Sequence, residues 1–95
     1  MIYEIRFDKT PTTQVINGKK KLVWVPRYTA DHFAVLSASL QAGLGDKFVA
    51  FGTTDEPTAQ KVSIEYVDQP TPEETDATNA QVDSIINAWA AGIGA

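Results

Sequence analysis

The 95-residue sequence contains no cysteine. Disulfides, thiolate metal sites, iron–sulfur clusters and cysteine nucleophiles are therefore excluded within it. A single histidine leaves carboxylates as nearly the whole supply of metal ligands, and the acidic clusters lack the spacing of a calcium-binding EF-hand loop. We expect no metal site and no cofactor.

Long apolar runs are also missing. None approaches the ~20 residues that a membrane-spanning helix requires. The opening stretch, MIYEIRFDK, carries charge early and has no apolar region of the signal-peptide kind. We therefore expect a soluble protein without a secretion signal or a membrane partner, located in the cytoplasm or associated with a virion.

The chain is short. Its 95 residues, 43% of them hydrophobic and 21% charged, predict one domain over residues 1–95. Such a domain holds one core with a net stability of about 5–10 kcal/mol, because burial barely exceeds the conformational entropy lost. Little room remains for a deep cleft beside that core, and this weighs against a self-contained enzyme.

Charge is distributed unevenly along the chain. Residues 1–28 hold six cations and two acids, a net +4, whereas residues 29–95 hold two cations and ten acids, a net −8. A small protein with a basic front and an acidic back can meet a partner, or a copy of itself, through opposite poles.

The strongest local signal is Asn17-Gly18, which stands between two strand-like runs. Both residues tolerate the positive φ of a type I′ turn, so the pair predicts a two-residue hairpin. The turn fixes the register, in which Ile16 faces Lys19 and Thr13 faces Leu22. We expect the tip of this hairpin to project into water with its lysines.

The hairpin becomes apolar on both faces toward residues 22–25. One face carries Val15, Leu22 and Trp24, and the other carries further aliphatic side chains. We therefore expect this end of the hairpin to be covered on both sides, with Trp24 in the core. Pro26 should end the pairing, because it lacks a backbone donor.

Two segments have apolar residues at helical spacing. The first follows Thr29, a suitable N-cap, and stops at Gly43 or Gly45. The second follows the capping box that begins at Thr71, and its apolar stripe starts at Val82. The turns before Val82 have little to bury, so we expect them to project or fray.

Alternating or buried runs over residues 2–7, 47–52 and 60–67 predict three further strands. The resulting order, β-ββ-α-ββ-α, indicates an α+β fold. We predict a single two-layer domain in which a mostly antiparallel sheet of about five strands packs against two helices.

His32 is the only histidine and Asp31 precedes it, so the two are a candidate pair for acid–base chemistry. Neighbouring residues on a helix point about 100° apart, so the two side chains do not face each other automatically. The simpler interpretation is a first-turn acid followed by a half-buried histidine. An enzyme centred on Asp31 and His32, helped by Tyr28 or Arg27, predicts a pocket at the start of the first helix. No serine lies in an activated-nucleophile motif, and we assign no catalytic residue.

Lys19, Lys20 and Lys21 form the one basic patch that could follow a phosphate backbone. A nucleic-acid-associated regulator that uses this hairpin is therefore a second hypothesis. The sequence pI of about 4.7 opposes it, because such proteins usually present a broad basic surface. Lysines at a hairpin tip also serve as solubilising and edge-protecting residues.

The apolar C-terminal segment offers a different contact. Trp89 and Ile93 either complete the core of this domain or reach a neighbouring subunit, where tryptophan is a common anchor. We predict a non-enzymatic structural or protein–protein interaction subunit, such as a small phage, virion-associated or assembly component, that self-associates or docks on a protein partner. The predicted contact residues are Lys19, Lys20, Lys21, Trp89 and Ile93.

Overall fold

The computed structural model describes residues 1–93, which form five strands and two helices. In chain order the elements are β1 (Ile2–Asp8), β2 (Thr10–Ile16), β3 (Lys19–Val25), α1 (Ala30–Leu44), a 3₁₀ turn η1 (Gly45–Lys47), β4 (Phe48–Asp55), β5 (Ala59–Tyr66) and α2 (Pro72–Ile93). The predicted α+β class and the predicted order of elements are confirmed.

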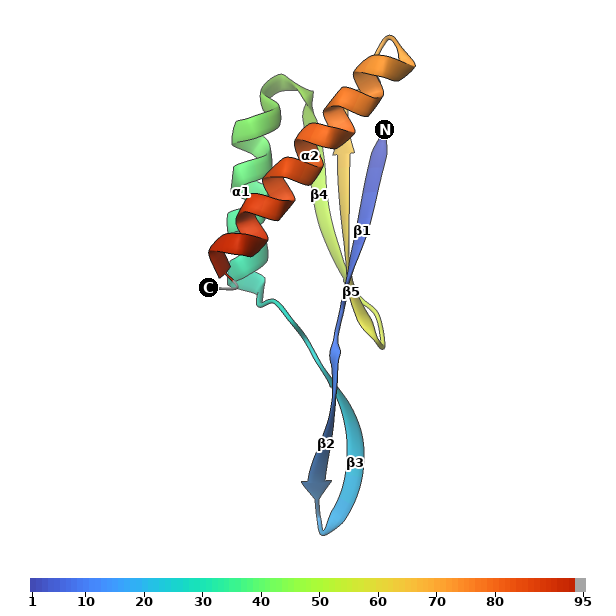
Figure 1. Cartoon of the computed structure of the whole chain (residues 1–95), viewed down its shortest axis with the longest axis vertical. Coiled ribbons are helices and arrows are strands. Elements are labelled where there is room, and N and C mark those ends of the chain that lie inside the picture. The colour runs from blue at the N-terminus through green and yellow to red at the C-terminus, as the bar shows by residue number, and fades with distance from the viewer. Residues whose placement is uncertain (94–95) are drawn as a thin grey trace.

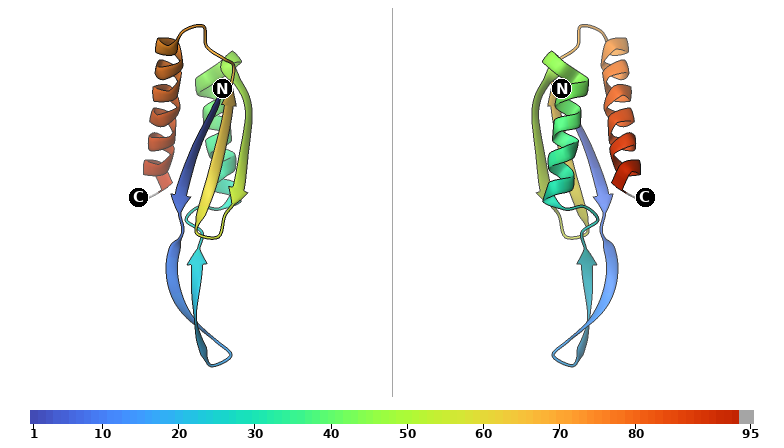
Figure 2. Two further views of the ribbon diagram at one scale, coloured as in Figure 1. Left: turned by 90° about the vertical axis from the view of Figure 1, so that its right-hand side faces the viewer. Right: turned by 90° about the vertical axis from the view of Figure 1, so that its left-hand side faces the viewer.

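The five strands are divided between two antiparallel sheets. A three-stranded sheet has the order β1-β5-β4, and both helices cover one of its faces (Figure 2). The hairpin β2–β3 forms the second sheet and extends away from the rest of the molecule (Figure 1). We call residues 10–25 the arm and the remainder the body. The arm gives the molecule its elongated shape, with extents of 58 × 24 × 18 Å.

The division has a simple geometric cause. β1 and β2 follow each other along nearly one line, with Lys9 between them (Figure 1). The partner of β1 is β5, and their pairing stops where Asp8 meets Ala59, the first residue of β5. Beyond this point the chain has passed the end of the body sheet, so β2 pairs with its own return strand.

The core lies between the body sheet and the two helices. β5 is the central strand, and it buries alternate side chains beneath the helices, among them Val62, Ile64 and Tyr66. The helices contribute the buried residues Leu36, Leu40, Leu44, Val82, Ile86 and Trp89.

Each helix begins at the predicted cap. Thr29 Oγ1 accepts a hydrogen bond from the backbone of His32 at 3.2 Å, and His32 Nδ1 accepts one from the backbone of Thr29 at 3.0 Å. His32 thus takes the place that glutamate or glutamine holds in the usual capping box. At α2, Thr71 Oγ1 accepts from the backbone of Glu74 at 3.2 Å.

The first turns of α2 are helical rather than frayed. Thr78 is buried there, and its hydroxyl donates a hydrogen bond of 2.9 Å to the carbonyl of Glu74. Asn79 accepts a hydrogen bond of 2.7 Å from the Tyr66 hydroxyl. The turns before Val82 contain few apolar side chains to bury, which is why the sequence suggested fraying. These polar contacts hold them in place instead. None of the helices formed by residues 1–93 is both long enough and apolar enough to cross a bilayer.

The hydroxyl of Tyr3 in β1 donates a hydrogen bond to Asp83 in α2 and so connects the edge of the sheet to the helix. Burial, reinforced by this bond and by the charge of Asp83, raises the pKa of Tyr3 to about 12. Because the folded state favours the protonated phenol, the stabilisation from this shift is complete below pH ~10 and is lost as the pH rises through about 12.

An absorbance titration of the tyrosines measures this directly. Tyr3→Phe should remove a titration step near pH 12, and Asp83→Asn should move that step to lower pH. If the parent protein and the Tyr3→Phe variant show the same last titration step, the step near pH 12 does not belong to Tyr3.

Candidate functional site

The arm is built as its sequence predicts. Asn17 and Gly18 have φ values of 53° and 77°, the positive region that a type I′ turn requires. The observed partners include Ile16 with Lys19 and Thr13 with Leu22, the predicted register. One face of the arm therefore presents Pro11, Thr13, Val15, Lys20, Leu22 and Trp24.

The apolar part of the arm is not covered, contrary to the sequence-based expectation. Val15 is 68% exposed, Leu22 is 61% exposed, and Trp24 is 38% exposed, so Trp24 is not a core residue. The expectation failed because the body sheet ends before the arm begins. Pro26 ends β3, and the first helix starts after the chain has returned to the body.

The tip of the arm is basic. Lys19, Lys20 and Lys21 are all exposed, as predicted, and residues 10–25 contain no acid. Lys20 lies on the same face as Leu22 and Trp24, and the two flanking lysines lie on the opposite face. The arm thus combines a cationic tip with exposed apolar side chains behind it.

The outgoing side of the arm is fastened to the body by Lys9. Its backbone N–H donates to the carbonyl of Thr58 at 2.9 Å, and its buried side chain places Nζ 2.6 Å from Asp55 Oδ1. Arg6 adds an ion pair with Glu56, in which Nε lies 2.8 Å from Oε1. The turn between β4 and β5 therefore binds the chain at the point where β1 passes into β2.

The returning side of the arm is fastened by one buried side chain, Gln60. Its Oε1 accepts hydrogen bonds from the backbone N–H groups of Arg27 at 3.1 Å and Tyr28 at 3.0 Å. Its Nε2 donates to the carbonyl of Tyr28 at 2.8 Å. The amide therefore pairs with the backbone much as a neighbouring strand would, and the base of the arm is held on both sides.

Sequence reasoning missed Lys9 and Gln60. The signal for Gln60 was present, because it continues the inward-facing series of Val62, Ile64 and Tyr66 by one step. A polar residue at an inward position needs a partner, and the nearest unpaired backbone belongs to the base of the arm. The burial of Lys9 had no comparable sequence signal.

The opposite end of the long axis is acidic. Residues 68–76 hold four acids, Asp68, Glu73, Glu74 and Asp76, and no cation. They run from the end of β5 into the start of α2, at the end of the molecule remote from the arm (Figure 1). Together with burial, the carboxylates of Asp76 and Asp68 raise the pKa of the Tyr66 phenol, as expected from a local excess of negative charge.

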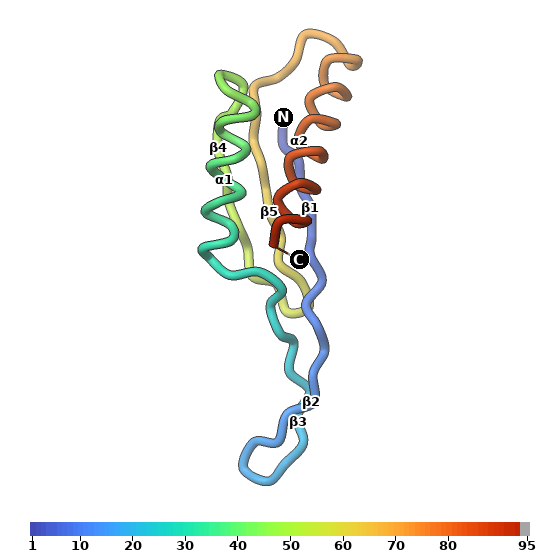
Figure 3. The backbone as a smooth tube through the Cα atoms, turned by 60° about the vertical axis from the view of Figure 1, so that its left-hand side comes forward, coloured from blue at the N-terminus to red at the C-terminus, as the bar shows by residue number. Residues whose placement is uncertain are grey.

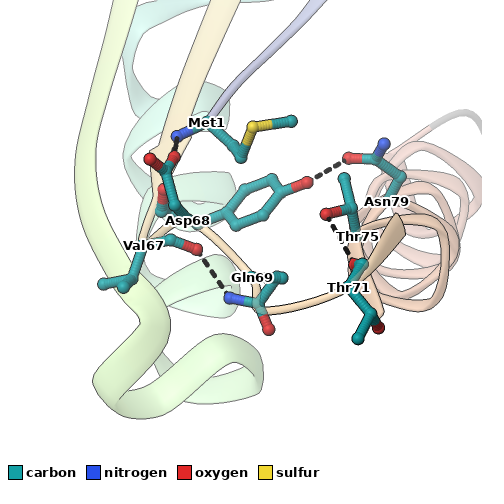
Figure 4. A network of polar contacts seen from close by, with 8 residues as sticks. Met1, Val67, Asp68, Gln69, Thr71, Thr75 and Asn79 are labelled. Atoms are coloured by element: carbon teal, nitrogen blue, oxygen red, sulfur yellow. Dashed lines mark hydrogen bonds and ion pairs between the residues drawn. The ribbon is translucent and has the colours of Figure 1, made fainter. Parts of the chain in front are cut away.

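The acidic end is held in place by a polar network (Figure 4). Asp68 Oδ1 lies 2.7 Å from the Met1 nitrogen, and Gln69 Nε2 donates a hydrogen bond of 2.6 Å to the carbonyl of Val67. The Thr75 hydroxyl donates to the carbonyl of Thr71 at 3.2 Å. Asp68 therefore stands on an ordered connection between β5 and α2, and the other three acids stand on the first turns of α2.

A groove separates α1 from the edge strand β4. It consists of two adjoining pockets, of about 200 and 260 Å³, that share Ala30, Phe33 and Thr53. The larger pocket is lined by Ala30, Phe33, Ala34 and Ser37 from α1 and by Phe51, Gly52 and Thr53 from β4. We call this the α1–β4 groove.

A pocket at the start of the first helix is thus present, but Asp31 and His32 are not among the residues that line it. His32 is engaged in the cap of α1, and within residues 1–93 no hydrogen bond joins it to Asp31. No group of three or more acidic or histidine side chains in the described part of the chain is placed to hold a metal ion.

Trp89, whose place in the core or at an interface the sequence left open, packs inside its own chain. It is 6% exposed, its Nε1 donates a hydrogen bond of 2.8 Å to the carbonyl of His32, and its ring lies against Phe7, Tyr28 and Phe33. Ile93 is partly buried against the same core. Of the five predicted contact residues, the three lysines are thus exposed and lie together.

Comparison with known proteins returns no matching protein family, no matching curated protein and no matching solved structure.

Gln60→Leu keeps the approximate size of the side chain and removes all three hydrogen bonds to the base of the arm. Unpaired buried backbone groups are costly, so the free energy of unfolding should fall by about 1–3 kcal/mol. Urea denaturation measures the change. The control is Gln41→Leu on the exposed side of α1, which should alter stability by less than about 0.5 kcal/mol. Equal losses in the two variants would show that Gln60 has no special role in holding the arm.

Proposed function

We propose that this chain is a non-enzymatic protein–protein interaction subunit that self-associates through its arm. The observation that carries the proposal is the exposure of Val15, Leu22 and Trp24 on an arm fixed at its base. Apolar groups gathered on an exposed surface beside charged ones are typical of interaction sites. The free energy gained by covering them favours a partner.

The distribution of charge supports a second copy as that partner. The arm carries three lysines at one end of the 58 Å axis, and residues 68–76 carry four acids at the far end. Two copies in antiparallel or end-to-end arrangement bring opposite charges together. Electrostatic attraction then selects the orientation, and burial of the apolar side chains supplies most of the affinity.

Protection of the strand edges does not account for the whole arm. Lysines at a hairpin tip prevent unwanted pairing, and Pro11 in β2 also lacks a backbone donor. Neither device explains a large aromatic side chain such as Trp24 in water, because a residue needed only for solubility would be polar. A contact surface accounts for Trp24 and the lysines together.

A small structural component of a larger assembly, such as a phage or virion, is the setting that we propose for this activity. Such components need rigid contact elements more than deep clefts, and the arm and body supply them. The proposed location follows the assembly, in the cytoplasm or on the virion.

Reversal of the tip charge tests the proposal. The triple variant Lys19→Glu, Lys20→Glu, Lys21→Glu should weaken self-association at least tenfold in sedimentation velocity at low ionic strength, because attraction to the acidic end becomes repulsion. The matched control replaces the same three lysines with arginine, which keeps the charge and should keep the association. A parent protein that is strictly monomeric at low salt and high concentration would refute self-association.

A second candidate, binding of nucleic acid by the arm, is favoured by one observation. Trp24 is exposed behind the lysines, where an aromatic ring could stack on a base. This alternative predicts salt-dependent binding of the parent protein to single-stranded DNA or RNA, measured by fluorescence anisotropy, and its loss in the lysine-to-glutamate variant. Absence of any salt-sensitive binding by the parent protein removes it.

A further inference from the structure

The α1–β4 groove has the form of a receptor for a large apolar side chain. Ala30, Ala34 and Ser37 occupy successive positions on one side of α1, and Gly52 lies across from them in β4. These small residues leave about 260 Å³ open between the aromatic rings of Phe33 and Phe51. Among residues 1–93, β4 pairs only with β5, so its second edge is unpaired.

The groove cannot be filled by the arm of the same chain. Gln60 and Lys9 fix the base of the arm, and the arm extends from there away from the body (Figure 3). The exposed apolar side chains of the arm can therefore enter this groove only in another copy.

We infer that the α1–β4 groove of one copy receives the face of the arm that carries Leu22 and Trp24 from a second copy. This inference rests on the proposed self-association and names the surface that the arm occupies. Leu22 and Trp24 are separated by one residue in β3, so both side chains point to the same face and enter the groove together.

The arm is long enough to reach from the groove to the far end of β4. From Trp24 to Lys19 the arm covers five residues, or about 17 Å. From Thr53 in the groove to Phe48 at the start of β4 is also five residues, or at most about 17 Å, because the register of β4 against β5 shifts between Phe48 and Ala50. With Trp24 at the level of Thr53, Lys19 reaches the level of Phe48.

The acids of the body lie at that level. Phe48 pairs with Tyr66, and Asp46, Glu65 and Asp68 are its neighbours along the chain or across the strand pair. Lys47 and the Met1 amino group, which is paired with Asp68, also lie here, so three acids stand against two cations. The seating that places Trp24 in the groove therefore brings the lysines to a region of net negative charge.

This seating requires the two copies to lie antiparallel. The arm must point toward the acidic end of its partner, and the partner's arm then points toward the acidic end of the first copy. The contact is reciprocal and has two-fold symmetry, so it closes at a dimer and leaves no unused arm to extend a filament.

Cysteine cross-linking tests the seating, because the chain contains no cysteine of its own. Leu22→Cys mixed with Ala34→Cys should form a disulfide-linked heterodimer under mild oxidation. The control mixes Leu22→Cys with Ser63→Cys, since Ser63 faces the side of the sheet away from the helices and should not be cross-linked.

A steric block gives an independent measurement in chains without cysteine. Ala34→Arg fills the groove on the exposed side of α1 and should weaken dimerisation at least tenfold in sedimentation velocity. Val35→Arg, next to it on the same helix but outside the groove, is the matched control and should leave dimerisation unchanged. Circular dichroism and thermal unfolding verify that both variants fold.

The outcomes separate this inference from the proposed function. A parent dimer that dissociates with salt, yet shows no cross-link to Ala34→Cys and equal dimerisation of Ala34→Arg and Val35→Arg, overturns the groove as receptor and leaves self-association intact. Assembly that continues beyond a dimer overturns the reciprocal arrangement. A parent protein that stays monomeric overturns both the groove contact and the proposed function.

Discussion

The elongated form of this protein depends on the side-chain amide of Gln60. Where the arm returns to the body, the backbone of residues 27–28 has no strand beside it. The Gln60 side chain takes the place of a neighbouring strand, because it accepts two hydrogen bonds from this backbone and donates one to it. Lys9 fixes the outgoing strand on the opposite side of the base. With attachments on both strands, the arm has a defined direction relative to the body.

A defined direction has an energetic benefit for association. Ordering a flexible hairpin at the moment of binding costs conformational entropy that must be subtracted from the affinity. Here the arm is already ordered in the folded chain, because the hydrogen bonds at its base form during folding. The same rigidity keeps the basic tip far from the acidic end, so their charges are not neutralised within one chain and stay available to a partner.

Much of this architecture was predictable from short-range sequence signals. Asn17-Gly18 gave the turn and its register, Thr29 and Thr71 gave the helix starts, and period-two alternation gave β1 and β5. These features depend on a few neighbouring residues. The exposure of Trp24 was not predictable in this way, because the sequence of an apolar hairpin does not show whether another element covers it. The α1–β4 groove was predicted only as a pocket at the start of the first helix. Its other wall in β4 was not predictable, since the spacing of the two elements is set by tertiary packing.

The type I′ turn also makes the arm adjustable in length. Adding two residues to each strand would lengthen the arm by about 7 Å and keep every existing side chain on its present face. Adding one residue to each strand between Lys20 and Trp24 would instead move Lys20 to the face opposite Trp24. The body would be unaffected, because its core contains no residue of the arm. Related chains could therefore vary the reach of this contact in steps of two residues per strand while keeping one fold, and partners with mismatched arms would be excluded by length alone.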